Sequence, residues 1–409
     1  MTSTDSSYAA EVAGLLWPEP WSAPQVSRRR ARRGDVRDAY VLPSVGRPRL
    51  LVPADVPGAT VMVRRLGAGR SVVSGPARRG LELAMRNRVL AAVRWPVLRT
   101  TASVAGTDSI ETHLGDRLGT DVRVGVLLGT RRVNQKPVLQ VFDRSGHVLG
   151  FAKVGHNPLT AELVRREATS LEAVRAAGPR SFGVPTVLAH DTWAGLEVLL
   201  LSPLVTDPDR PVPASHRLDA MREVARLTGT DEQALAGSGF WARLRSEADR
   251  LAGTADAGRL ASTVTALEDR HGGETVEIGA WHGDWGHWNQ GQGDDGLLIW
   301  DWERFDAQVP VGFDALHHAA QLVRPGERDW ERQESEFLAA TPRLLDDLGV
   351  PPVRHALTLC LYLLEIAVRY ADALTHGATP ALTRRTAWVQ GLLERQLAAP
   401  HPALLEGRP

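Results

Sequence analysis

Residues 121–205 contain the pattern that most constrains the fold of this chain. Three apolar stretches come first, DVRVGVLLGT, PVLQVFD and HVLGFAKV, and the turn sequence RSG joins the last two. A helical stretch follows over residues 159–177, and two further strand-like stretches, VPTVLAH and LEVLLLSPLV, are linked by TWAG. The short connections predict an antiparallel sheet of five strands with one main helix after the third strand.

The helix over residues 159–177 has well-marked ends. Asn157 and Pro158 are a typical cap residue and first helical residue, and Gly178 is a typical stop. Its apolar stripe consists of Leu163, Val164, Ala168, Leu171 and Val174. Glu167 lies within this stripe at helical spacing, so we expect its carboxylate to face the protein interior.

Lysine is rare in this chain, which uses arginine for almost every positive charge. The 48 lysines and arginines include only two lysines, Lys136 and Lys153. Lys153 lies on the same predicted strand face as Leu149 and Phe151. A buried carboxylate is costly unless it is paired, so we predict an ion pair between Lys153 and Glu167. In the alternative, Glu167 only borders the core and binds an arginine.

The order of the elements predicts the fold class. After residue 205 the pattern is mostly helical, interrupted by TVEIGAWHGDW and GLLIWDWE. Five strands with one helix, followed by a helical half, is the element order of a two-lobed protein kinase. We therefore predict an α+β, two-lobed protein kinase-like fold, with an antiparallel five-stranded N-lobe, one main N-lobe helix, a mostly helical C-lobe and an N-terminal extension.

The predicted domains follow from the same pattern. In the extension, YVLP, RLLVP and TVMVRRL predict strands and LELAMRNRVLAAV predicts a helix. The first stretch of the chain is mixed in composition and contains the cluster SRRRARRGD, so we expect it to be loose. The predicted boundaries are a flexible Arg-rich tail at 1–37, an α/β extension of unknown role at 38–106, the N-lobe at 107–204 and the C-lobe with the catalytic loop at 205–409.

The stretch WHGDWGHWNQ places polar residues among tryptophans. Phosphoryl transfer to a hydroxyl needs a carboxylate that accepts a proton and oxygen ligands for magnesium. Asp284 and Asn289 are five positions apart, as in the protein kinase catalytic loop. Asp301 follows the strand GLLIW, where a second carboxylate would bind the metal. We expect His282 to brace the loop through a hydrogen bond and the tryptophans to pack around these polar residues.

These residues resemble a known signature. His282, Gly283, Asp284 and Asn289, followed by a strand that ends in D-W-E, look like the motif H-G-D-x-x-x-x-N of the aminoglycoside phosphotransferase and choline kinase-like family. The resemblance covers residues 107–400. The tryptophan before the asparagine and the later GFDALHH resemble a subset whose genes often lie among polysaccharide-biosynthesis genes. Where family members usually carry a proline before the asparagine, this chain has glycine and histidine.

The family resemblance implies a role for each matching residue. Asp284 would be the catalytic base, assisted by His282, and Asn289 and Asp301 would be the magnesium ligands. The cofactor-binding residues would be Lys153, Glu167 and Phe151, with Lys153 on the nucleotide phosphates. The implied activity is an ATP- and Mg²⁺-dependent kinase that phosphorylates a hydroxyl of a sugar-like or glycan-related small molecule. The alternative is a catalytically silent kinase-like module that binds nucleotide or a partner protein.

Composition limits the partners. The 48 acidic residues balance the 48 basic ones, so nothing favours nucleic acid. Between residues 217 and 270, nine acidic residues stand against eight arginines, which favours a neutral polyhydroxylated acceptor over a polycationic aminoglycoside. The longest apolar run contains Glu365 and is too short for a membrane span. The one cysteine, Cys360, is expected in the core of a cytoplasmic protein.

Two sets of residues are left without an assigned chemical role. Asp314, His317 and His318 are not expected to form a metal site, because adjacent histidines on a helix point in different directions. Asp294 and Asp295 are expected to be turn residues. The identity of the acceptor, the choice between ATP and GTP, and the oligomeric state are left open by the sequence.

Overall fold

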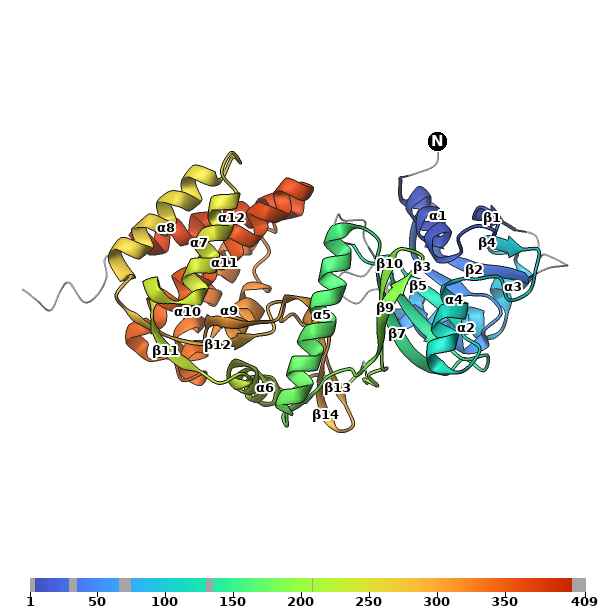
Figure 1. Ribbon diagram of the computed structural model, residues 1–409, viewed down its shortest axis with the longest axis horizontal. Helices are drawn as coiled ribbons and strands as arrows, with labels where there is room; N and C mark the ends of the chain where they lie inside the picture. Colours follow the sequence, from blue (N-terminus) through green and yellow to red (C-terminus); the bar gives the residue numbers. More distant parts are fainter. Residues whose placement is uncertain (1–3, 29–34, 66–74, 130–134, 208, 399–409) are drawn as a thin grey trace, which may run out of the picture. The chain divides into compact units, whose positions relative to one another are not determined.

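The computed structural model describes residues 4–28, 35–65, 75–129, 135–207 and 209–398. The chain divides into two compact units (Figure 1): a first made of Met1–Glu172 and Pro185–Val205, and a second made of Ala173–Val184 and Thr206–Pro409.

The described part of the first unit is built around an antiparallel sheet of nine strands in the order β1-β4-β2-β3-β5-β6-β7-β10-β9. The strands are β1 (Gln25–Ser27), β2 (Asp35–Ser44), β3 (Arg47–Pro53), β4 (Val97–Ala102), β5 (Arg123–Leu127), β6 (Val138–Phe142), β7 (Val148–Gly155), β9 (Val187–Trp193) and β10 (Leu196–Leu201). The predicted five-stranded sheet is confirmed as one contiguous half of this sheet, β5 to β9. The other half comes from residues before 103 and joins through the pairing of β3 with β5.

The beginning of the chain differs from the expected loose tail. Thr4–Leu16 forms helix α1, and Tyr8, Val12 and Leu16 are buried. Their spacing of four residues gives the helix an apolar stripe, which packs on the sheet. This stripe is not evident from the sequence, because small residues fill most of the positions between its members and leave only a weak contrast between the two faces of the helix. Most of the predicted arginine-rich segment, residues 29–34, lies outside the described residues.

A second difference concerns TVMVRRL, which the sequence predicts as a strand. Pro57–Arg65 is a 3-10 helix, η1, on the sheet face opposite α1. Val56, Ala59 and Met62 are buried at intervals of three residues, which is the period of a 3-10 helix. Two more helices, α2 (Gly75–Arg86) and α3 (Val89–Ala92), replace the single predicted helix of the extension.

Helix α4 (Ile110–Leu118) contacts β9, and α5 (Pro158–Ala177) follows β7 along the chain. Both ends of α5 are confirmed: Oδ1 of Asn157 accepts a hydrogen bond from the Thr160 backbone at 2.9 Å, and Gly178 has a φ of +65°. The predicted apolar stripe of α5 is buried throughout. The helix therefore holds Glu167 in the position that its spacing predicts.

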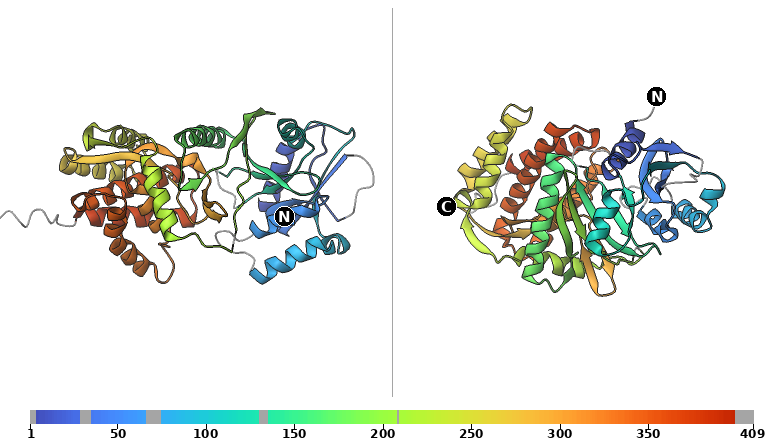
Figure 2. Two further views of the ribbon diagram at one scale, coloured as in Figure 1. Left: turned by 90° about the horizontal axis from the view of Figure 1, so that it is seen from below. Right: turned by 45° about the vertical axis from the view of Figure 1, so that its right-hand side comes forward.

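The described part of the second unit contains seven α-helices and two small sheets, which Figure 2 shows from two further directions. The helices are α6 (Ala214–Arg226), α7 (Gly239–Arg250), α8 (Ala257–His271), α9 (Phe313–Ala320), α10 (Trp330–Asp347), α11 (His355–His376) and α12 (Pro380–Ala398). One sheet has the order β11-β12-β15 and the other β13-β14-β8. Their strands are β8 (Phe182–Gly183), β11 (Asp231–Ala234), β12 (Thr275–Trp281), β13 (Gln290–Gly293), β14 (Gly296–Ile299) and β15 (Asp306–Pro310).

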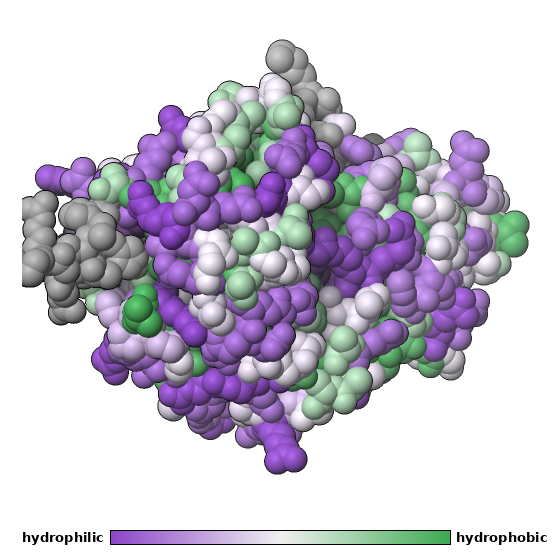
Figure 3. Space-filling view, turned by 60° about the vertical axis from the view of Figure 1, so that its left-hand side comes forward, coloured by the Kyte–Doolittle hydropathy of each residue, from purple (hydrophilic) through white to green (hydrophobic). Residues whose placement is uncertain are grey.

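Helix α11 is the centre of the second unit. It contacts α7, α8, α9, α10 and α12. Cys360 on this helix is buried, and burial raises the pKa of its thiol to about 12, so it is the inert core residue that the sequence predicts. No helix in the described part of the chain is long and apolar enough to cross a membrane. On the face drawn in Figure 3, hydrophilic side chains predominate and hydrophobic ones lie in small groups.

Candidate functional site

Lys153 and Glu167 form a buried ion pair in the first unit. The Nζ atom of Lys153 lies 2.6 Å from Oε1 and 2.5 Å from Oε2 of Glu167. The Glu167 side chain is fully buried and the Lys153 side chain is 10% exposed. The ion pair predicted from the sequence is therefore present, and it ties β7 to α5. Removing one partner of such a pair leaves a buried charge without compensation, at a cost of about 3–5 kcal/mol.

Strand β7 carries Phe151 and Lys153 on one face, as predicted, but Leu149 is on the other. The pairing of β6 with β7 shifts its register near Leu149. Leu149 instead packs against the core cluster that contains Ala152. A bulge adds one unpaired residue to a strand, so the side chains before it lie on the opposite face from the one that strict alternation predicts. The sequence alone does not show that this bulge is present.

The loop between β12 and β13 brings Asp284 and Asn289 together. The Nδ2 group of Asn289 donates to the backbone carbonyl of Asp284 at 2.9 Å and to its Oδ2 at 3.0 Å. The Asp284 side chain is 35% exposed, whereas Asn289 is buried. The loop thus presents a carboxylate that is fixed in position and accessible to solvent.

His282 braces this loop, as the sequence predicts. Its Nδ1 accepts a hydrogen bond from the Asp284 backbone N–H at 3.2 Å, and its Nε2 donates to the Trp300 carbonyl at 3.1 Å. The tautomer with the proton on Nε2 follows from these two partners. The ring is fully buried, and this burial lowers the pKa of His282 to about 4. A neutral imidazole therefore fixes the Asp284 backbone relative to the end of β14.

Asp314 and Arg369 anchor the loop backbone, and the sequence did not assign either to the site. The Oδ2 of Asp314 accepts from the His282 N–H at 2.7 Å, and its Oδ1 accepts from the Gly283 N–H at 3.2 Å. Burial raises the pKa of Asp314 to about 7, although both hydrogen bonds favour the carboxylate. The Nη1 of Arg369 donates to the Gly283 carbonyl at 2.6 Å. Because Asp314 is on α9 and Arg369 is on α11, two helices hold one short loop.

His317 is a further residue of the site that the sequence did not identify. Its Nε2 lies 3.5 Å from Oδ1 of Asp284, and its side chain is 3% exposed. The ring also contacts the Tyr362 hydroxyl at 3.2 Å and the Gln321 amide at 2.8 Å. Burial lowers the pKa of His317, while Asp284 raises it. Both oxygens of the Asp284 carboxylate therefore have a neighbour that limits their rotation.

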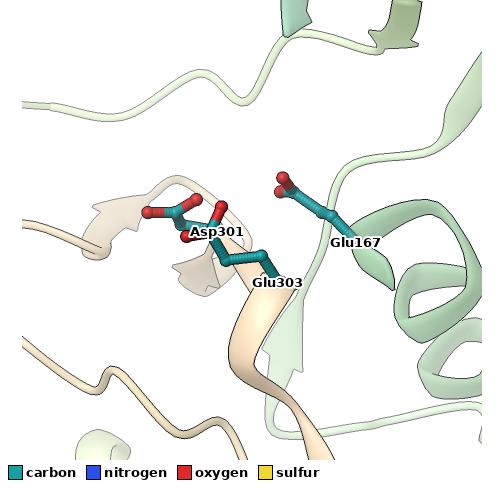
Figure 4. A group of neighbouring side chains, drawn as sticks. All are labelled: Glu167, Asp301 and Glu303. Carbon is teal, nitrogen blue, oxygen red and sulfur yellow. The ribbon is translucent and has the colours of Figure 1, made fainter. Parts of the chain in front are cut away.

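Asp301 directly precedes η3 (Trp302–Arg304), which contains Glu303, and Trp300 separates Asp301 from the end of β14. A carboxylate oxygen of Asp301 lies within 4.8 Å of one from Glu303 (Figure 4). Asp301 has a φ of 72° and a ψ of 56°, a left-handed conformation that aspartate tolerates better than most residues. The preceding Trp300 connects this turn to the loop, because its N–H donates to the Asn289 carbonyl at 3.1 Å.

Tryptophans surround these polar residues, as predicted. Trp281, Trp285 and Trp302 are each at most 1% exposed. Trp302 packs edge-on against the His282 ring at 4.6 Å between centroids, and the Arg369 guanidinium lies 4.8 Å from the centroid of the Trp281 ring.

No family model and no curated protein matches the chain. Among solved structures, it is similar to a putative fructosamine-3-kinase from Haemophilus somnus 129PT, with 15% identity, a TM-score of 0.42, and coverage of 70% of this chain and 96% of the other. It is similar to aminoglycoside phosphotransferase APH(4)-Ia in complex with ADP and hygromycin B, with 15% identity, a TM-score of 0.48, and coverage of 72% and 100%. For choline kinase LicA from Streptococcus pneumoniae the values are 14%, 0.45, 71% and 99%. Since all three TM-scores are below 0.5, the fold assignment rests on the strand order described above.

Proposed function

We propose that the chain is a member of the aminoglycoside phosphotransferase and choline kinase-like family and an ATP- and Mg²⁺-dependent small-molecule kinase. The observation that carries this proposal is the loop geometry around Asp284. One partly exposed carboxylate is fixed by Asn289 and His317 within a loop whose backbone is anchored by Asp314 and Arg369. A structural aspartate does not need such support, whereas a general base must be held within hydrogen-bond reach of its proton.

Asp284 would act on the acceptor hydroxyl. The hydroxyl oxygen attacks the γ-phosphorus, the bond from that phosphorus to the bridging oxygen breaks, and the hydroxyl proton passes to the Asp284 carboxylate. The hydrogen bond from Asn289 to Oδ2, at 3.0 Å, orients the carboxylate. His282, which is neutral and buried, positions the loop and takes no proton at neutral pH.

The donor set near Asp284 fits magnesium, which prefers oxygen ligands. Because the Asn289 amide nitrogen is engaged with Asp284, its amide oxygen would be the atom that binds the metal. The neighbouring carboxylates of Asp301 and Glu303 would supply two further oxygen ligands. A bound magnesium ion would neutralise the charge on the nucleotide phosphates.

The Lys153–Glu167 pair supports a nucleotide site in the first unit. A buried lysine in a chain that otherwise uses arginine indicates a need for a compact ammonium group. We infer that Lys153 contacts the nucleotide phosphates, that Glu167 fixes its position, and that Phe151 borders the nucleotide on the same strand face. We also infer that the acceptor is sugar-like or glycan-related rather than an aminoglycoside, because acidic and basic residues are nearly balanced between residues 217 and 270.

Asp284→Asn tests the assignment of the base. We expect transfer to fall by roughly 10² to 10⁴-fold, the usual contribution of a positioned base, with little change in the binding of Mg-ATP. Asp294→Asn, an exposed exchange in the turn between β13 and β14, is the matched control and keeps full activity. Phosphoryl transfer is measured as ATP consumption over a panel of neutral sugars, acidic sugars and aminoglycosides. Equal turnover in wild type and Asp284→Asn would show that Asp284 is not the catalytic base.

The alternative function is a catalytically silent module that binds nucleotide. A thermal-shift titration with ATP, with and without magnesium, distinguishes the two functions when combined with the turnover assay. An enzyme shows a magnesium-dependent shift and turnover, and Asp301→Ala abolishes the magnesium dependence. A silent module shows the shift without turnover for any member of the panel. Strong turnover confined to aminoglycosides would keep the kinase and overturn the proposed acceptor class.

A further inference from the structure

Arg217, on the first turn of α6, differs from the other partly buried arginines of the second unit. Arg243 pairs with three carboxylates, Arg369 binds a carbonyl and Glu365, and Arg385 binds two carbonyls and a hydroxyl. Within the described residues, the guanidinium of Arg217 has no hydrogen bond and no ion pair. It is half-buried, and this burial lowers the pKa of Arg217. A desolvated cation without a counter-ion is unfavourable unless a ligand supplies one.

The acids of the same helix do not neutralise Arg217. Asp219 pairs with Arg222 at 3.2 Å. Glu223 accepts hydrogen bonds from the backbone N–H groups of Arg180 and Ser181, both at 2.7 Å. Both carboxylates of α6 therefore have other partners, and the balanced charge of this segment in the sequence does not describe the surroundings of Arg217.

His318 has one ring nitrogen that lacks a hydrogen-bond partner within the described residues. Helix α6 packs against α9, which carries His318. The Nδ1 atom of His318 is buried and has no hydrogen-bond partner, whereas the ring binds the Trp285 backbone. Burial, followed by the charge of Arg217, lowers the pKa of His318 to about 4. The ring is therefore neutral at pH 7, and Nδ1 offers a lone pair that can accept a hydrogen bond from a hydroxyl.

The location of the two groups connects them to the proposed chemistry. His318 binds the backbone of Trp285, the residue after Asp284, and the preceding His317 contacts the Asp284 carboxylate. His318 therefore belongs to the helix that supports the proposed base, and α6, which carries Arg217, packs against that helix. A polycationic acceptor would be repelled by Arg217, and a purely neutral one would leave its charge unpaired.

We propose that Arg217 and His318 form an acceptor subsite that binds a sugar carrying an anionic group, with Arg217 on the carboxylate or phosphate and His318 Nδ1 on a neighbouring hydroxyl. This inference rests on the proposed function for the identity of the ligand as an acceptor. The anion-binding property of Arg217 does not depend on it. A planar guanidinium binds carboxylate and phosphate oxygens in pairs, which explains why the chain places arginine here.

The first experiment measures anion binding without catalysis. Inorganic phosphate is titrated at constant ionic strength into wild type, Arg217→Gln and Arg226→Gln, with ADP saturating any nucleotide site, and the shift in Tm is recorded. Arg226 is the control because it is an exposed arginine on the same helix. We expect phosphate to stabilise wild type and Arg226→Gln, and to bind at least about tenfold more weakly to Arg217→Gln. Equal shifts in all three proteins, or no shift in wild type, would overturn the subsite.

The second experiment distinguishes the ligand classes and separates this inference from the proposed function. Glucose, glucuronate and glucose 6-phosphate are compared in the ATP-consumption assay with wild type, Arg217→Lys and Arg217→Gln. We expect an acidic sugar to be preferred, with KM raised at least about tenfold in Arg217→Gln and less in Arg217→Lys, and kcat changed less than KM. Turnover of glucose alone, unaffected by Arg217→Gln, keeps the kinase and overturns the subsite. Arg217-dependent phosphate binding without turnover of any sugar keeps the subsite and counts against the kinase.

Discussion

At the scale of one residue, the rarity of lysine in this chain indicates that Lys153 has a specific role. The two short contacts to Glu167 and the 10% exposure of the Lys153 side chain leave little room for a larger group. We predict that Lys153→Arg keeps the charge but weakens ATP binding at least about tenfold, because a guanidinium is larger and differently hydrated than an ammonium. Calorimetric titration with ATP measures this change.

Arg165→Lys is the matched control for Lys153→Arg. Arg165 is exposed and its ion pairs with Glu162 and Glu197 lie at the surface, where such pairs contribute little. We expect this exchange to leave ATP affinity unchanged. Lys136, which the sequence left without a role, is not a suitable control, because it is also buried. Unchanged affinity in Lys153→Arg would contradict the inference from lysine scarcity.

His282 leads to a prediction about pH. Its pKa is about 4 in the folded protein and about 6.5 in an unfolded chain, so the unfolded state binds the extra proton between these values. The stability that the neutral ring contributes is complete above pH 6.5 and is lost as the pH falls toward 4. We therefore expect His282→Asn to be less stable than wild type at pH 7.5 but to lose less stability between pH 7.5 and pH 5. Urea unfolding at both values measures this, and identical losses in the two proteins would contradict it.

At the scale of one element, the loop between β12 and β13 depends on Gly283. Its φ is +81°, and a Cβ atom there would lie 2.2 Å from the Arg304 carbonyl oxygen. We predict that Gly283→Ala destabilises the protein by a few kcal/mol and abolishes transfer, because the loop must leave both Asp314 and Arg369 to relieve the contact. Thermal unfolding and the ATP-consumption assay measure the two effects.

Gly273→Ala provides the comparison for this loop. A methyl group on the Cα atom of Gly273 would extend into open space, and the residue has no positive φ, so the exchange is expected to leave stability and activity near those of wild type. If Gly283→Ala behaves like Gly273→Ala, the loop is more adaptable than its hydrogen bonds indicate, and Asp284 is not held as rigidly as the proposed function requires.

Elements with a strong local signal were predictable from the sequence. Helix α5 has a cap, a stop and an apolar stripe, and its bounds agree with the expectation to within one residue. Where the signal is not local, prediction failed. The bulge near Leu149 depends on how β7 pairs with β6, which the sequence of β7 does not show. The sequence of η1 has a three-residue period, but over so short a stretch it cannot be told from the sequence of a strand.

At the scale of the whole molecule, the sequence indicates which residues we propose for the chemistry, but it does not indicate the residues that hold them. Asp284 and Asn289 are five positions apart, so their spacing already indicates a shared loop. Asp314 and Arg369 lie 31 and 86 residues beyond Gly283, and only the fold brings them to its backbone. The sequence does not indicate the role of His317, because nothing in it shows that α9 directs this side chain toward Asp284.

The N-terminal extension leads to the last prediction, because it shares one sheet with the predicted N-lobe. Strand β3 pairs with β5, and α1 covers the same core cluster to which Val124 and Val126 of β5 belong. A chain that begins at residue 107 would expose that core and leave the edge of β5 unpaired, a combination that favours aggregation. We predict that such a chain is insoluble or lacks a cooperative thermal transition. Circular dichroism during heating measures this, and a cooperative transition near the wild-type Tm would show that the predicted boundary at 106 separates two independent domains.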